Sequence, residues 1–316
     1  MAKNTSDPVG TLSIGNVITT STTLYKSNFK RYLLVSLRAI AWIFALGAAS
    51  FGLVALGGRL YDVTKSEVVK IPVGLGTLAV VLYFMAKYAT DRATICRLAY
   101  QELIDAPETL ADATRHLLPR TWAFLRLNLL LILCLFLVSL IAGVVLLAFI
   151  FLVVAALLYV FKLSPTDTAV AFVIGLLTIG LFVVWIAIIF RYYAYWFVAE
   201  LPLAVESTTS ANFSIRRSRQ LTGRAVGNVL LIMTIAFLIV APLNTVSSIP
   251  SFLGSMMTNP ILSSDASTQF IGGILTIVGT VLTLAIELLL MPFWQIIKAI
   301  VYFDLRNRRE GNDLVI

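Results

Sequence analysis

Residues Leu127–Phe161 read LNLLLILCLFLVSLIAGVVLLAFIFLVVAALLYVF and contain no charged side chain. A helix needs about 20 mainly apolar residues to cross the roughly 30 Å hydrocarbon core of a bilayer. This stretch therefore predicts a transmembrane helix that is longer than one crossing requires. No turn residues mark a break near Gly143, where the run could divide into two spans. We expect one long helix, followed by a second long helix that begins at Pro165.

The rest of the chain contains five further apolar runs of similar character. The chain has 316 residues, of which 59% are hydrophobic and 13% are charged, whereas soluble domains have about 25% charged residues. No polar stretch is long enough for a separate soluble domain, so we expect one all-α membrane domain, residues 1–316, with a cytoplasmic tail at 303–316. The six predicted spans, paired as three hairpins, are 33–57, 71–95, 127–161, 165–198, 225–246 and 270–291.

The basic residues are unevenly distributed between the connections of these spans. With both termini and the second-to-third and fourth-to-fifth connections on one side, the opposite side holds four of the 24 Lys and Arg residues. Lys and Arg accumulate in cytoplasmic loops, so we expect both termini in the cytoplasm. The net charge of +8 is then explained by contact with anionic lipid headgroups and not by binding of nucleic acid.

An amphipathic stretch precedes each odd-numbered span. The stretches are Ser13–Tyr25, Glu108–Leu118 and Ala204–Leu221, and basic residues follow each one. This pattern favours helices that lie in the membrane interface, and ordinary cytoplasmic connecting helices are the alternative. Three copies indicate a threefold repeat of an interfacial helix followed by a hairpin.

Among the charged side chains within the predicted spans, three stand out: Arg38, Arg191 and Glu287. A charge inside the hydrocarbon core is costly unless it is paired or reaches the interface. A long arginine side chain can reach the interface, but Glu287 is too short to do so easily. We predict that Glu287 pairs with Arg191 or Arg38 and locks the helix bundle. A proton or ion site at Glu287 is the alternative.

No arrangement of residues typical of an enzyme is visible. The chain has one histidine, His116, no phosphate-binding glycine loop and no Cys/His set with metal-ligand spacing. The sequence therefore predicts no catalytic residue, no cofactor and no metal. Four acidic residues of the second-to-third connection are expected to form a solvated helix face: Glu102, Asp105, Glu108 and Asp112.

Two cytoplasmic stretches carry a family resemblance. They are ESTTSANFSIRRSRQLTGR (Glu206–Arg224) and YFDLRNRREGNDL (Tyr302–Leu314). With the six spans, they resemble the membrane domain that is fused to some bacterial glycerophosphodiester phosphodiesterases and that also occurs alone in bacterial membrane proteins. The matching residues are Glu206, Arg217, Ser218, Leu221, Gly223, Tyr302, Asp304, Leu305, Arg306, Arg309 and Glu310.

The resemblance implies a fold, a topology and a place in the bacterial cytoplasmic membrane or an internal membrane derived from it. It does not imply hydrolysis, because this chain has no phosphodiesterase domain. In the second stretch, Asp304 and Arg308 are four residues apart, as are Arg306 and Glu310, and such pairs stabilise a helix modestly. We also expect Asp304 and Glu310 to reach the arginines of the first stretch, which are Arg216, Arg217, Arg219 and Arg224.

These observations favour a non-enzymatic membrane protein that organises lipid or partner proteins, with anionic headgroups and a second membrane protein or a second copy as partners. Two alternatives stay open. One is a transporter or channel-like protein that uses Glu287, and the other is an accessory protein of lipid-headgroup metabolism. A polar cavity around Glu287 would favour transport, whereas a buried ion pair would favour a scaffold.

Overall fold

The computed structural model describes residues 14–161, 168–206, 210–259 and 265–310. All regular structure in these ranges is helical, and six helices are long and apolar enough to cross a membrane. The protein is thus an all-α polytopic membrane protein, as predicted. Its helices are α1 (Ile14–Ser27), α2 (Phe29–Thr64), α3 (Lys70–Leu103), α4 (Leu110–Leu117), α5 (Thr121–Phe161), α6 (Thr168–Tyr195), α7 (Glu200–Val205), α8 (Ala211–Thr222), α9 (Val226–Met257) and α10 (Ala266–Glu310), with short 3-10 turns at Glu67–Val69 and Leu118–Arg120.

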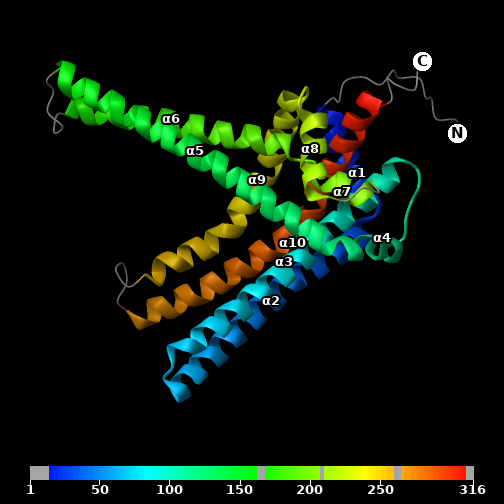
Figure 1. The fold of residues 1–316 in the computed structure, drawn as a ribbon, viewed down its shortest axis with the longest axis horizontal. Helices are drawn as coiled ribbons and strands as arrows, with labels where there is room; N and C mark the ends of the chain where they lie inside the picture. Colours follow the sequence, from blue (N-terminus) through cyan, green and yellow to red (C-terminus); the bar gives the residue numbers. More distant parts are fainter. Residues whose placement is uncertain (1–13, 162–167, 207–209, 260–264, 311–316) are drawn as a thin grey trace.

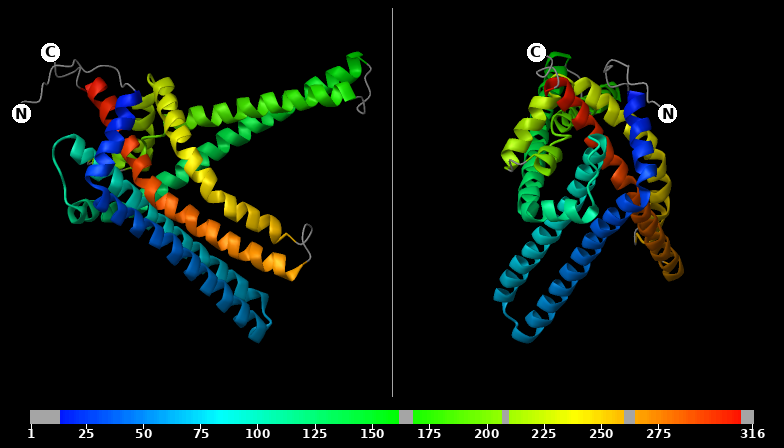
Figure 2. Two further views of the ribbon diagram at one scale, coloured as in Figure 1. Left: turned by 180° about the vertical axis from the view of Figure 1, so that it is seen from behind. Right: turned by 90° about the vertical axis from the view of Figure 1, so that its right-hand side faces the viewer.

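The long helices form three hairpins, α2/α3, α5/α6 and α9/α10, which diverge from a compact region (Figures 1 and 2). We call the hairpins the arms and the compact region the base. The base consists of α1, α4, α7 and α8 together with the adjoining ends of the long helices. The first and last described helices, α1 and the end of α10, both lie there, which agrees with an even number of membrane crossings.

The helices are longer than the predicted spans. The third span is a single helix of 41 residues without a break at Gly143, so division into two spans is wrong. The predicted start of the fourth span at Pro165 falls outside the described residues. The tail predicted at 303–316 continues α10 as helix to Glu310, the last described residue, and α10 runs through Pro292.

Pro292 lacks a backbone N–H, so the carbonyl four residues earlier, that of Leu288, loses its helical donor in the preceding turn of α10. The Tyr25 hydroxyl of α1 donates to the Leu289 carbonyl in that turn, with 2.9 Å between the two oxygens. Burial raises the pKa of the Tyr25 phenol, which therefore remains a hydrogen-bond donor at neutral pH. α1 thus supports α10 where the proline weakens the helix.

The three amphipathic stretches are α1, α4 and α8, each directly before the first helix of an arm. α4 and α8 begin with side-chain caps, because Thr109 and Ser210 accept the backbone N–H groups of Asp112 and Phe213. Such a cap stabilises a helix by about 1 kcal/mol. The apolar faces of these helices are buried in the base, as Val17, Leu117 and Leu221 illustrate. The repeat of helix plus hairpin is therefore visible three times.

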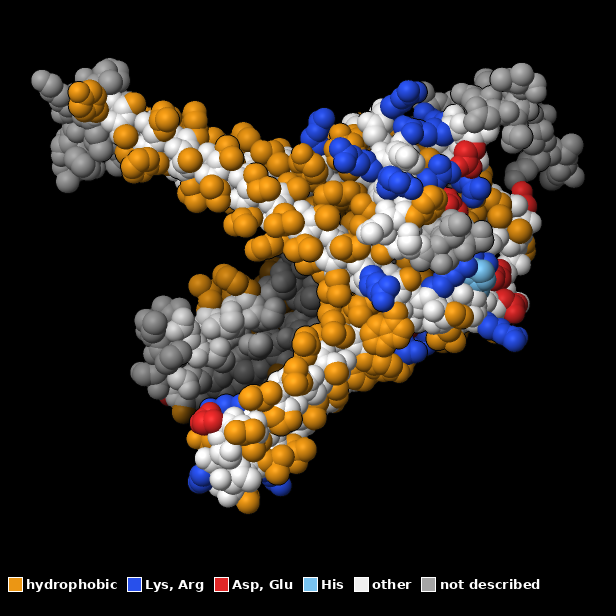
Figure 3. Space-filling model, in the orientation of Figure 1, with side chains coloured by type: hydrophobic (Ala, Val, Ile, Leu, Met, Phe, Trp, Pro, Cys, Tyr) orange, Lys and Arg blue, Asp and Glu red, His pale blue; other side chains and the backbone are white. Residues whose placement is uncertain are grey.

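The base and the arms carry different surfaces. Lys and Arg side chains gather over the base, whereas hydrophobic side chains cover the arms (Figure 3). A soluble protein does not leave such continuous apolar surface in water, so lipid is the environment that fits the arms. The largest buried side chains, such as Tyr32, Phe124 and Tyr302, belong to helix ends in the base.

Within the α9/α10 arm, small residues bring the two helices together. A Cβ added at Gly272 would come within 2.7 Å of the Met257 Cβ, and one added at Gly279 would meet the backbone of Ser251. Close approach through small residues is the usual basis of helix packing in lipid. Gly272 therefore packs closely against α9, whereas nothing lies within 4 Å of a Cβ added at Gly273.

Candidate functional site

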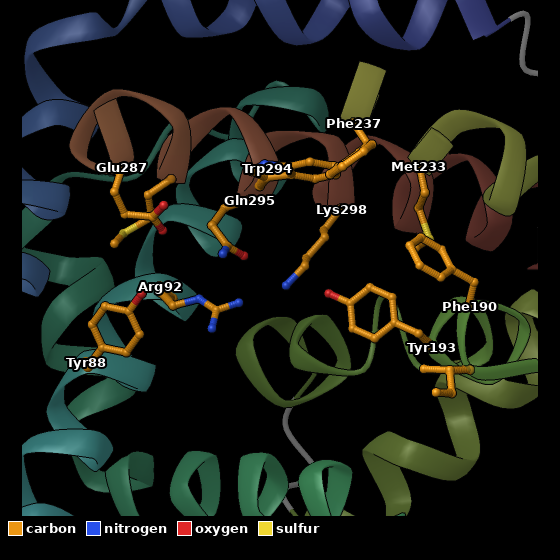
Figure 4. Close-up of a pocket in the computed structure, with 12 residues that line it drawn as sticks. Tyr88, Arg92, Phe190, Tyr193, Met233, Phe237, Glu287, Trp294, Gln295 and Lys298 are labelled. Carbon is orange, nitrogen blue, oxygen red and sulfur yellow. The ribbon is translucent and has the colours of Figure 1, made fainter. Parts of the chain in front are cut away.

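A pocket of about 450 Å³ lies where the three arms meet the base. Helices α3, α6, α9 and α10 line it, so each arm contributes. Figure 4 shows the polar ends of Arg92, Lys298 and Tyr193 pointing toward one another. The lining residues are Tyr88, Arg92, Ile189, Phe190, Tyr193, Met233, Phe237, Glu287, Met291, Trp294, Gln295 and Lys298.

The pocket lies one membrane thickness away from the far ends of the arms. Arg92 is 22 residues after Lys70, where α3 begins, which corresponds to ~33 Å at about 1.5 Å per residue. Glu287 is 21 residues after Ala266, where α10 begins, or ~32 Å. The hydrocarbon core is about 30 Å thick. These separations are close to one hydrocarbon thickness, so a bilayer that covers the arms from their far ends would reach the level of the pocket.

A buried ionic network forms the floor of the pocket. The Glu200 carboxylate at the start of α7 lies 3.1 Å from Nη2 of Arg92 and 3.1 Å from Nζ of Lys298. In the amide orientation that satisfies both of its ends, Gln295 accepts from Arg92 and donates to Glu200. A buried charge is tolerated only when it is paired and hydrogen-bonded. The network thus joins α3, α7 and α10 at the point where their arms separate.

Glu287 does not make the predicted ion pair. Arg38 instead contacts Asp91, at 2.5 Å, and the Trp42 indole N–H also donates to that carboxylate. Arg191 is exposed and has no ion-pair partner among the described residues. Glu287 is exposed into the pocket and, within the same ranges, has no hydrogen bond or ion pair. The reason is topological, because the Glu287 side of α10 faces the pocket and not either arginine.

The residues of the floor were missed at the sequence level, although a signal was present. Glu200 lies in the apolar stretch AYWFVAELPLAV and Lys298 in WQIIKAIVYF, each as an isolated charge. The reasoning applied to Glu287 would have selected both. Arg92 gives a weaker signal, because several polar residues surround it.

The two stretches that carry the family resemblance meet in the base, as predicted. Arg217 of α8 contacts Glu310 of α10, and its Nε is 3.5 Å from Glu206. The Tyr302 hydroxyl donates to Glu206 at 2.7 Å, and Arg306 contacts Glu310 at 2.6 Å. This network fixes the end of α10 against α8.

The other residues of these stretches have separate roles. Asp304 pairs with Arg308 on its own helix at 2.6 Å, so the expected pairing of Asp304 with the arginines of α8 is wrong. The Ser218 hydroxyl donates to the Tyr195 carbonyl, and a Cβ at Gly223 would lie 3.0 Å from the Arg219 carbonyl. No ion pair within the described residues involves Arg216, Arg219, Arg224 or Arg309.

Further ion pairs hold the base together. Glu102 contacts Arg31 at 3.1 Å and Glu108 contacts Arg97 at 2.7 Å. These two carboxylates are therefore structural, and the expectation that they form a solvated face is wrong. Among the described residues, no group of three or more His, Cys, Asp or Glu side chains could hold a metal ion.

Comparison of the chain with protein-family models, curated proteins and solved structures finds no match. The resemblance to the membrane domain of glycerophosphodiester phosphodiesterases therefore stays a prediction. The fold and the pocket define a class of protein: a polytopic α-helical membrane protein whose three arms diverge from a junction that contains the pocket described above.

Proposed function

We propose that this protein is a non-enzymatic membrane protein that organises lipid, and that it holds a lipid headgroup in the pocket at the junction of its arms. The observation that carries the proposal is the position of the pocket, about one hydrocarbon thickness (~30 Å) from the far ends of the arms. Acyl chains of a lipid seated there would extend along the apolar arms, and its headgroup would meet the polar floor.

The chemistry of the lining supports this proposal. Aromatic side chains such as Tyr88, Phe237 and Trp294 supply apolar walls, while Arg92 and Lys298 supply positive charge at the floor. Sites for small molecules usually combine mostly apolar walls with a few placed polar groups. Aromatic residues with a polar end also favour the interface between hydrocarbon and headgroups.

The distribution of basic residues supports a cytoplasmic base. The second-to-third and fourth-to-fifth connections, which contain α4 and α8, belong to the side that holds 20 of the 24 Lys and Arg residues. Lys and Arg near an anionic leaflet contribute about 1 kcal/mol each to its attraction. We therefore place the base, with its unpaired arginines, on the cytoplasmic leaflet, and the membrane is the bacterial cytoplasmic membrane if the family resemblance holds.

Transport through Glu287 receives less support than lipid retention. Transporter sites lie near the midplane and are typically formed by broken helices, whereas Glu287 lies near one boundary of the hydrocarbon in an unbroken helix.

A scaffold for partner proteins remains the second interpretation of the same fold. The exposed α5/α6 arm is then the surface that a membrane-protein partner or a second copy would cover. The accessory role in lipid-headgroup metabolism rests on the family resemblance alone.

Lipid analysis of the purified protein tests the proposal. The double variant Phe190→Ala/Phe237→Ala removes two pocket walls that are 42% and 51% exposed, so the fold should survive. The matched control Phe151→Ala/Phe172→Ala removes two exposed phenylalanines from the α5/α6 arm, away from the pocket. We expect mass spectrometry to find phospholipid retained by the native protein and the control, and several-fold less in the pocket variant. Equal retention in all three proteins would refute a lipid site in this pocket.

A further inference from the structure

The charges in the pocket are balanced in number but separated in space. Arg92 and Lys298 carry two positive charges, and Glu200 and Glu287 carry two negative charges. Glu200 is ion-paired with Arg92 and Lys298 in the floor network. Glu287, in contrast, has no described cation within 4.0 Å. The pocket therefore contains one unsatisfied carboxylate and a group of donors that lies apart from it.

Part of Arg92 remains available to a ligand. Its Nη2 and Nε face Glu200 and Gln295, but Nη1 has no protein acceptor among the described residues. The side chain is 26% accessible, and Nη1 does not belong to the buried atoms that lack a partner. The Tyr193 hydroxyl points toward the Lys298 amine and the Arg92 guanidinium in Figure 4, and it makes no hydrogen bond to a described residue. Together these two groups offer N–H and O–H donors that suit a phosphate.

Resting on the proposed function, we propose that the pocket selects a zwitterionic aminophospholipid, with the phosphate on Arg92 and Tyr193 and the primary ammonium on Glu287. A headgroup of this kind carries both charges a few bonds apart, so it can satisfy both ends of the pocket at once. The Arg92 guanidinium already lies over the Tyr88 ring, 5.7 Å from its centroid, and the ring of Trp294 adds a surface that favours a cation over its face.

An anionic phospholipid fits the same pocket less well. Its phosphate could meet Arg92, but without an ammonium group the guest adds a net negative charge to a pocket that already holds the Glu287 carboxylate, and it supplies no cation to that carboxylate. Like charges at short distance disfavour binding. Because the four charged groups sum to zero, a guest without net charge leaves the pocket electrically balanced.

The test uses the full-length protein in detergent and two lipids with identical acyl chains, phosphatidylethanolamine and phosphatidylglycerol. Native mass spectrometry measures the Kd of each lipid for the unaltered protein and for Glu287→Gln. We expect phosphatidylethanolamine to bind at least about tenfold more tightly, because a hydrogen-bonded charge pair contributes about 1.5–3 kcal/mol. Glu287→Gln should lower this affinity about tenfold and leave phosphatidylglycerol binding equal or stronger. The variant should fold, since Glu287 has no protein partner to lose.

The matched control is Glu67→Gln, which removes an exposed carboxylate at the far end of the α2/α3 arm and should change neither Kd. Equal affinity for the two lipids, or an unaltered preference in Glu287→Gln, would overturn the headgroup selection. These results are distinct from failure of the proposed function. If Phe190→Ala/Phe237→Ala weakens both lipids equally while neither lipid is preferred, the pocket binds lipid without selecting the headgroup. If that variant weakens neither lipid, both proposals fail.

Discussion

Helix α5 belongs to both regions of the molecule, and two of its phenylalanines show how the regions differ. Phe124 near its start is 0% exposed in the base, whereas Phe151 in the arm is 78% exposed. The same side chain on the same helix thus meets packed protein at one end and an apolar environment outside the protein at the other. The base is held by tertiary contacts and ion pairs, and the arms are held by contacts within each hairpin and by lipid.

The largest effect is expected from the floor of the base. Glu200→Ala removes the acceptor shared by Arg92 and Lys298 and leaves two buried cations without a counter-charge. Removal of one partner from a buried pair costs about 3–5 kcal/mol, and the loss should be near the upper limit because two partners are affected. Thermal unfolding in detergent measures it. The control Glu67→Gln changes an exposed carboxylate at the far end of the α2/α3 arm, so its unfolding temperature should stay close to that of the native protein. A similar unfolding temperature for Glu200→Ala and the native protein would show that the network does not hold the base.

Phe124 and Phe151 of α5 give the next largest contrast. Phe124→Ala should lower the free energy of unfolding by about 3 kcal/mol, since it leaves a cavity in the base. Phe151→Ala should change it by less than about 0.5 kcal/mol, because exposed substitutions away from special features have small effects. Unfolding curves of the two variants in the same detergent provide the comparison. Equal losses would mean that the arm is covered by protein, such as a second copy, and would favour the partner reading.

The smallest effect is expected from glycine contacts inside an arm. Gly279→Ala places a methyl group against the backbone of Ser251 on α9, and overpacking of this kind costs about 1–3 kcal/mol. Gly273→Ala lies on the same helix, meets nothing within 4 Å, and should be neutral or stabilising, because alanine favours helix more than glycine. Thermal unfolding and cross-linking between α9 and α10 measure the outcome. Identical behaviour of the two variants would show that α9 and α10 tolerate separation.

The sequence predicted the fold to the extent that local composition decides it. Long apolar runs specify membrane helices regardless of their neighbours, because a backbone in lipid must satisfy its own hydrogen bonds. The same logic gave the amphipathic helices before each arm and the pairs four residues apart near Glu310. The helix ends were harder to predict, because α9 continues through Pro242 and Pro250, and α10 continues through Pro292 into polar residues that the base buries, such as Gln295 and Lys298.

The candidate site could be predicted only in part. Glu287 was selected from its apolar surroundings, but its predicted partners were wrong, since Arg38 meets Asp91 on the neighbouring helix. Arg92, Glu200 and Lys298 are far apart in the chain, and a sequence shows an isolated charge without showing which other charge approaches it. Ion pairing depends on distances of a few ångströms, and those distances arise from how the arms join.

By itself, the sequence determined the class of protein, the number of arms and the amphipathic helices that precede them, because each depends on hydrophobic and charge patterns within a single segment. Only the tertiary structure decided which charges are neutralised and which carboxylate stays unpaired. It also decided that α3, α6, α9 and α10 enclose a pocket beside Glu287. Ion pairing and the formation of a pocket require contact between segments more than 100 residues apart, such as those of Glu200 and Arg92. No local sequence pattern predicts such a contact.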